Sequence, residues 1–203
     1  MKTRKFLIAL VLGMGTATAW AGETEERPLY KDSLAPIESR VEDLLRRMTL
    51  HEKTLQLQNK PVGRIDEIES IFQGQSYGCT HEMGKTAEEC AGIYNELQKY
   101  MLTKTRLGIP ILTAVEGIQG ILQNNSTLFP HSIAQGSTFN PELIERMTDA
   151  AGKEAAAMGI HQVLSPVFDI ARELRWGRVE ETYGEDPFLI SEMGIGFVKG
   201  YQK

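Results

Sequence analysis

The chain has 203 residues, of which 41% are hydrophobic and 24% charged, and these values are ordinary for a globular protein. Its formal net charge is -5, and it carries no basic stripe interleaved with aromatic residues, which argues against a nucleic-acid-binding protein. The length suits one domain or slightly more.

The first residues have the pattern of an export signal. Three basic residues precede an apolar run at residues 6–14, and Ala19 and Ala21 give the small–x–small pattern that a signal peptidase recognises. We therefore expect residues 1–21 to be a signal peptide and the protein to be exported, either periplasmic or secreted. The apolar run is far shorter than the roughly 20 residues that span a bilayer, so we expect no membrane span.

Residues 22–75 predict a helical lead-in. Pro36 suits the first turn of a helix, and the apolar residues after it recur at helical spacing up to Met48. Thr49 and Glu52 have the spacing of a capping box, which predicts a second helix starting at residue 50.

Residues 76–203 alternate between strand and helix patterns. We expect strands at residues 77–80, 111–115 and 161–170, and helices at residues 86–104, 141–158 and 187–203. Such alternation predicts an α/β fold with a parallel sheet. An open doubly wound sheet is the alternative, but no glycine-rich phosphate loop follows any strand. We expect instead the N-terminal part of a TIM-like (β/α)₈ barrel, incomplete in this chain because a whole barrel needs about 250 residues.

Two cysteines, Cys79 and Cys90, lie near the end of the first expected strand and in the next helix. An oxidising compartment would permit a disulfide, and the geometry would allow one. Two cysteines alone do not establish the bridge, so both states stay open. The four histidines have no paired ligand spacing, so we expect no metal site.

Charged residues cluster where the second and third strands are expected to end. Glu116 and Gly117 follow the second strand, Asp169 ends the third, and residues 172–181 mix arginines with glutamates. In barrels of this kind the active site lies at the carboxyl ends of the strands. Carboxylates and guanidinium groups can hold sugar hydroxyls through charge-assisted hydrogen bonds. On charge alone, a loop of mutually neutralised ion pairs is an equally good interpretation.

Several sequence blocks resemble one family in order along the chain. These are Arg40-Val41-Glu42-Asp43-Leu44-Leu45, Met48-Thr49-Leu50, Gly108-Ile109-Pro110, Glu116 to Gly120, Phe129-Pro130, Ser165-Pro166-Val167-Phe168-Asp169, Arg175-Trp176-Gly177-Arg178 and Tyr183-Gly184-Glu185-Asp186-Pro187. The chain resembles glycoside hydrolase family 3, the exo-acting β-glucosidases and β-xylosidases, over nearly its whole length after residue 21. The arginine–tryptophan block followed by Gly184-Glu185-Asp186-Pro187 is the most specific part of the likeness.

The resemblance implies roles for five residues. Arg178 and Glu116 would bind hydroxyls of the terminal sugar in the −1 subsite. Asp169, Arg175 and Glu181 would support Arg178 and the strand end. The implied substrate is a β-linked oligosaccharide or glycoside, from which terminal non-reducing β-D-glucosyl residues are hydrolysed with retention and without a cofactor.

Two departures from the family pattern matter. The acidic position is often aspartate followed by a histidine, whereas here it is Glu116 with Gln119. The longer glutamate could fill the space of a hexose CH₂OH group, which favours a β-xylosidase as the alternative. The family's aspartate nucleophile and general acid match nothing in residues 22–203, so we expect no catalytic residue in this chain. A natural short product that binds sugar without cutting it is the remaining alternative.

Overall fold

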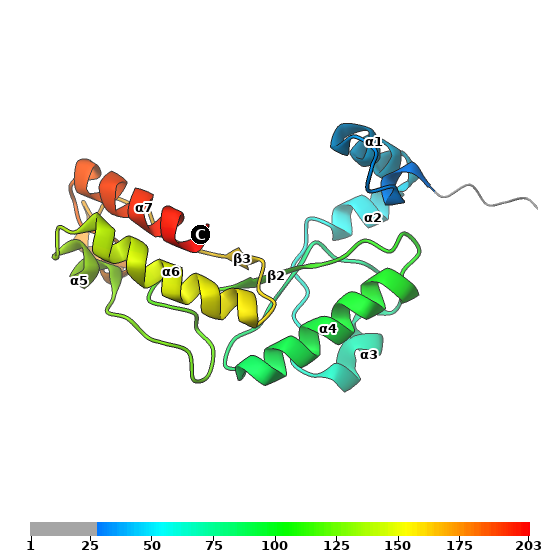
Figure 1. Ribbon diagram of the computed structural model, residues 1–203, viewed down its shortest axis with the longest axis horizontal. Coiled ribbons are helices and arrows are strands. Elements are labelled where there is room, and N and C mark those ends of the chain that lie inside the picture. The colour runs from blue at the N-terminus through cyan, green and yellow to red at the C-terminus, as the bar shows by residue number, and fades with distance from the viewer. Residues whose placement is uncertain (1–27) are drawn as a thin grey trace, which may run out of the picture. The chain divides into compact units, whose positions relative to one another are not determined.

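The computed structural model describes residues 28–203, which form two units: the residues up to Arg47, and Met48–Lys203 (Figure 1). The expected signal peptide at residues 1–21 lies outside the described residues. Within the described part, no helix is long and apolar enough to cross a membrane.

In the described residues 28–47, the first unit contains a 3₁₀ turn and one helix. The 3₁₀ turn η1 covers Leu29–Lys31, and helix α1 covers Ile37–Arg47, which confirms the helix expected after Pro36. Asp43 joins the two, because its Oδ2 accepts the backbone N–H of Tyr30 at 3.1 Å and Nε of Arg47 at 3.0 Å.

The second unit begins with short helices. Helix α2 covers Leu50–Leu55, the 3₁₀ turn η2 covers Ile65–Glu67, and helix α3 covers Ile68–Phe72. The expected capping box is present: Thr49 Oγ1 accepts the backbone N–H of Glu52, and the Glu52 carboxylate accepts the backbone N–H of Thr49. The same carboxylate binds Arg106 through two hydrogen bonds of 2.8 and 2.5 Å.

A parallel sheet forms the centre of the second unit. Strands β1 (Cys79–His81), β2 (Leu112–Val115) and β3 (Gln162–Val163) pair in that order, with Thr80 opposite Thr113 and Ala114 opposite Gln162. Helix α4 (Ala87–Lys104) connects the first two strands, and helices α5 (Ser132–Gly136) and α6 (Pro141–Ala157) connect the second to the third. Helix α7 (Pro187–Tyr201) follows β3. The expected α/β class, with βα units of a TIM-like barrel, is thus confirmed.

The third strand is much shorter than expected. The sequence pattern predicted a strand at residues 161–170, but only Gln162–Val163 pair as a strand, and Leu164 adds one hydrogen bond to Val115 at 2.8 Å. Pro166 has no N–H to donate to a ladder, so the apolar alternation beyond it does not continue the pairing. The chain then forms the 3₁₀ turns η3 (Leu174–Trp176) and η4 (Val179–Glu181).

One residue pair extends the sheet beyond β1. Asn59 forms a parallel bridge with Cys79, and the backbone N–H of Lys60 donates to the Cys79 carbonyl at 2.9 Å. The sequence predicts a helical lead-in over residues 22–75 and does not indicate this contact. The proposed boundary at residue 75 stays a prediction.

Helices α6 and α7 lie side by side and approach closely (Figure 1). A Cβ atom at Gly196 would stand 2.5 Å from the Pro141 carbonyl oxygen, and one at Gly200 would stand 1.9 Å from Thr148 Oγ1. Only glycine permits this approach. The two cysteines are free thiols, Cys90 buried and Cys79 half-buried.

Candidate functional site

The candidate site is built on the carboxyl ends of β2 and β3. Glu116 directly follows Val115, the last residue of β2, and Asp169 lies in the segment after β3. Because the strands are parallel, both loops leave the sheet at the same edge.

The loop after β2 is held by hydrogen bonds to its own residues and to the loop after β1. The Glu116 carbonyl accepts the backbone N–H of Leu122 at 3.1 Å. The buried side chain of Gln123 donates to the Glu82 carbonyl at 2.8 Å and accepts the Lys85 N–H at 2.8 Å. The sequence does not indicate Gln123, since a glutamine in a polar turn has no distinguishing motif.

Arg178 is held by Glu181. Its Nε lies 2.9 Å from each Glu181 carboxylate oxygen, and its Nη2 donates to Oε2 as well. The Trp176 ring centroid lies 5.8 Å from the guanidinium carbon, within range of a cation–π contact. Glu181 therefore fixes the orientation of the guanidinium group, as two hydrogen bonds to one carboxylate usually do.

Two other carboxylates of the site also affect the pKa of Arg178. The pKa of Arg178 is raised, first by its hydrogen bond to Glu181 and then by the charges of Glu181, Asp169 and Glu116. The arginine thus stands within electrostatic range of both acidic residues. The charges of Glu181, Asp169 and Glu116 therefore all act on Arg178, although these residues come from two separate loops.

Arg175 forms an ion pair of its own. It binds Glu173 through Nε at 2.8 Å and Nη2 at 2.7 Å, and its side chain is 90% exposed. This bond lowers the pKa of Glu173 to about 2. The arginine-rich loop thus contains two ion pairs. Arg175 and Glu173 neutralise each other locally, whereas Arg178 and Glu181 form the pair on which the charges of Glu116 and Asp169 act.

Three further polar residues lie in or near these loops, and of these the sequence pattern indicates only Gln119. The charge of His131, which precedes α5, contributes to the lowered pKa of Glu181, whose main cause is the hydrogen bond from Arg178. Nε2 of His81 and Oε1 of Gln119 are buried without a hydrogen-bond partner among the described residues. A lone histidine at a strand end has no motif, so its place in the fold is needed to notice it.

The arrangement suits hydroxyl groups better than metal ions. Within residues 28–203 no group of three or more metal-ligating side chains comes together. A guanidinium that one carboxylate holds, and on which the charges of two others act, offers donors and acceptors for a pair of neighbouring sugar hydroxyls.

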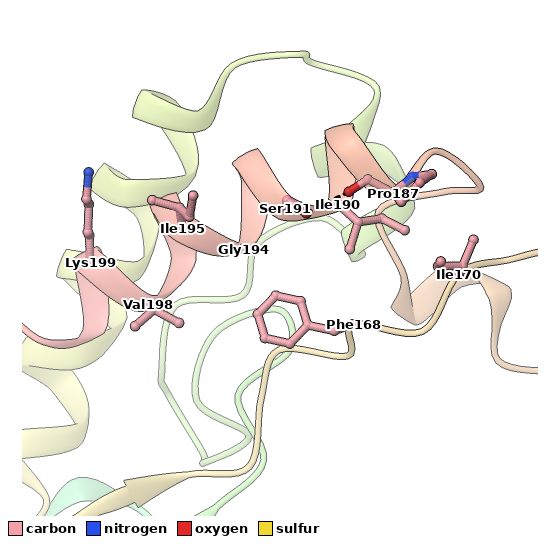
Figure 2. A pocket seen from close by; sticks show the side chains of 9 residues that line it. All are labelled: Phe168, Ile170, Pro187, Ile190, Ser191, Gly194, Ile195, Val198 and Lys199. Carbon is pink, nitrogen blue, oxygen red and sulfur yellow. Dashed lines mark hydrogen bonds between the residues drawn. The ribbon is translucent and has the colours of Figure 1, made fainter.

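A separate apolar groove of about 550 Å³ lies beneath α7 (Figure 2). The Phe168 ring points toward α7 and passes so close that a Cβ at Gly194 would stand 2.1 Å from it. Neither Glu116 nor Arg178 lines the groove. Phe168, which lines the groove, directly precedes Asp169 in the chain.

Comparison with known proteins identifies the family. A family model described as the N-terminal domain of glycosyl hydrolase family 3 matches residues 49–203. The chain belongs to glycosyl hydrolase family 3. Arg178 and the three carboxylates whose charges act on it lie within the matched segment of this family.

Relatives in glycosyl hydrolase family 3 carry two kinds of name. A putative β-xylosidase of Formosa agariphila is 30% identical over 98% of this chain, and a periplasmic β-glucosidase of Salmonella typhimurium is 33% identical over 80%. The solved structure of a β-glucosidase from Erythrobacter marinus superposes with a TM-score of 0.74, at 29% identity over 86% of the chain. The chain spans only 28%, 20% and 24% of the lengths of these three proteins.

Proposed function

We propose that the complete protein is a retaining β-glycosidase that removes terminal non-reducing β-D-glucosyl residues from oligosaccharides or glycosides. The observation that carries this proposal is the oriented guanidinium of Arg178, which lies within electrostatic range of Glu116 and Asp169. Membership in glycosyl hydrolase family 3 and the β-glucosidase names of several relatives support it.

In this proposal Arg178 and Glu116 bind hydroxyls of the terminal sugar. Glu181 keeps the guanidinium in orientation, and Asp169 adds negative charge beside it. Arg175 acts on the loop through Glu173 and not directly on Arg178. Residues 28–203 bind and orient the sugar in this scheme, and none of them is assigned as the nucleophile or the general acid.

A β-xylosidase is the second candidate. The glutamate at position 116 extends one methylene further than an aspartate and would occupy space near the CH₂OH group of a hexose. A putative β-xylosidase among the relatives supports this alternative. The two sugars differ at that group, so a change at Glu116 separates the candidates.

The test uses the complete gene product and the 4-nitrophenyl β-glucoside and β-xyloside. We expect Arg178→Lys to lower kcat/KM by about tenfold to a hundredfold, because lysine cannot replace a two-point contact. We expect Glu116→Asp to shift the ratio of the two activities toward the glucoside. If the ratio of the two activities is the same in Glu116→Asp and the wild type, the argument for a pentose is wrong. Binding of sugars without any release of nitrophenol would favour a non-catalytic binding protein.

We also infer that residues 1–21 direct export, with cleavage after Ala21. The basic start, apolar run and small-residue site support this inference, as does the periplasmic relative. Mass spectrometry of protein from a periplasmic extract should find Gly22 as the first residue. Protein retaining Met1 in the cytoplasmic fraction would contradict it.

A further inference from the structure

The backbone on either side of Gly117, the residue after Glu116, is held by side chains from other elements. The Gly117 N–H donates to Ser165 Oγ at 3.2 Å, and the Gly117 carbonyl accepts the Tyr201 hydroxyl at 3.1 Å. The sheet and the loop hold the residues just before it, because the carbonyls of Val115 and Glu116 accept backbone N–H groups. The polypeptide carrying the Glu116 side chain is therefore held at four main-chain polar groups between Val115 and Gly117.

The two side chains come from distant parts of the sequence. Ser165 lies just beyond β3, and Tyr201 is the last residue of α7, 84 residues away from Gly117. The Tyr201 ring packs on Phe197 at a centroid distance of 4.9 Å and contacts both hydrophobic clusters of this unit. Burial raises the pKa of the Tyr201 phenol, so the hydroxyl keeps its proton and remains a donor.

Steric contacts also exclude a side chain at position 117. A Cβ atom there would stand 2.3 Å from Val163 Cγ1 and 2.9 Å from the Tyr201 hydroxyl oxygen. Separations this short require the neighbours to move. The absence of a side chain at Gly117 thus lets β3 and α7 approach the strand end that carries Glu116.

We propose that Tyr201 and Ser165 are positioning residues, which set the place of the Glu116 carboxylate relative to Arg178 by fixing the Gly117 backbone. The proposal rests on the proposed function, in which Glu116 binds a sugar hydroxyl. Neither residue contacts the sugar in this scheme. Helix α7 therefore contributes to sugar binding through its last residue, although it carries none of the proposed ligands.

The chain offers matched controls for both residues. Tyr94 is also buried, but its hydroxyl has no hydrogen-bond partner among the described residues, so Tyr94→Phe removes the same atom without loosening a site loop. Ser70 donates to the Glu67 carbonyl in the α3 region, far along the chain from Glu116. Ser70→Ala is therefore the control for Ser165→Ala.

The first measurement needs no activity. Hydrogen exchange of the Gly117 amide, followed by mass spectrometry in the complete protein, should become about threefold to tenfold faster in Ser165→Ala and Tyr201→Phe. Exchange at this amide should stay unchanged in Tyr94→Phe and Ser70→Ala. Unchanged exchange in both test variants would overturn the proposal.

The second measurement separates positioning from simple loss of stability. We expect the KM for the preferred glycoside, and the Ki for the free sugar, to rise by about threefold to tenfold in Tyr201→Phe and Ser165→Ala, with a smaller change in kcat. A purely structural role would lower the melting temperature and the active fraction and leave KM and Ki unchanged.

Comparison with Glu116→Asp shows whether the positioning proposal alone is wrong or the proposed role of Glu116 as well. If that variant raises KM while Tyr201→Phe and Ser165→Ala do not, positioning is wrong and the proposed role of Glu116 stands. If none of the three changes KM or Ki, Glu116 does not bind the sugar, and both proposals are wrong.

Discussion

The Nε atom of Arg178 lies at the same distance, 2.9 Å, from both carboxylate oxygens of Glu181, three residues further along the chain. The hydrogen bond between them raises the pKa of the arginine and lowers that of the glutamate, so both remain charged near neutral pH. A charged arginine alone would sample many rotamers. The glutamate removes that freedom before a ligand arrives, which lowers the entropic cost of binding.

The first prediction concerns this pair. Glu181→Gln keeps the shape of the side chain and removes the charge, so Arg178 should lose its fixed orientation. We expect about a tenfold weaker affinity of the complete protein for the free sugar, measured by calorimetry. Glu180→Gln, at the exposed neighbouring position, is the control and should bind normally. Equal affinities in the two variants would refute the role of Glu181.

The second prediction is a pH dependence of stability. Arg106 is the main cause that lowers the pKa of Glu52 from 4.5 to about 2. The stabilisation from this carboxylate is therefore complete above pH 4.5 and is lost as the pH falls from 4.5 towards 2. Glu52→Gln should lower the free energy of unfolding by about 1–2 kcal/mol at neutral pH, and by much less near pH 2.

A second capping box provides the comparison for Glu52. Thr86 and Glu89 form the same motif at the start of α4, and the lowered pKa of Glu89 comes first from the backbone N–H of Thr86 and not from an arginine. Glu89→Gln should therefore be the milder change in urea unfolding. A larger loss for Glu89→Gln than for Glu52→Gln would contradict the importance of the Arg106 contact.

The third prediction concerns Gly194 in α7. Alanine favours a helix over glycine by about 1 kcal/mol, but its Cβ would stand 2.1 Å from the Phe168 ring. Gly194→Ala should therefore lower the free energy of unfolding by about 1–3 kcal/mol. In a Phe168→Ala background the overlap is gone, and the same change should increase stability by up to about 1 kcal/mol. The same sign in both backgrounds would show that Phe168 does not fill this space.

The fourth prediction concerns the cysteines. Both are free thiols, and burial is the main cause that raises the pKa of Cys90. Alkylation of the native protein should therefore modify Cys79 well before Cys90, since the thiolate is the reactive form. After unfolding without a reductant, mass spectrometry should find two alkyl groups. A protein that takes up none and weighs 2 Da less than the reduced chain would contain the disulfide instead.

Local patterns predicted much of the fold. Thr49 with Glu52 marks a helix start because the Thr49 side chain accepts an N–H group three residues away, and the structure confirms it. The Asn140 side chain caps α6 in the same way. The alternation of strand and helix likewise predicted the parallel sheet. These features depend on neighbours in the sequence, which is why the sequence alone can indicate them.

Long-range geometry could not be predicted in the same way. Nothing in the sequence indicates that Asn59 bridges Cys79, or that Arg175 binds Glu173 while Arg178 binds Glu181, because each arginine has several glutamates within reach. The sequence pattern also did not predict the early end of β3, since the apolar residues after Pro166 do not pair as a strand. At the site, the sequence indicates Glu116 but not the side chains that hold the backbone beside it.

The glycine contacts between α6 and α7 fix the position of α7 along its own axis. With Gly196 and Gly200 seated against Pro141 and Thr148, the helix has a single longitudinal position on its neighbour. One inserted residue between Gly200 and Tyr201 would carry the phenol about 1.5 Å along the axis and about 100° around it, out of reach of Gly117. The spacing of Gly196, Gly200 and Tyr201 within helix α7 therefore cannot change without loss of one of these contacts.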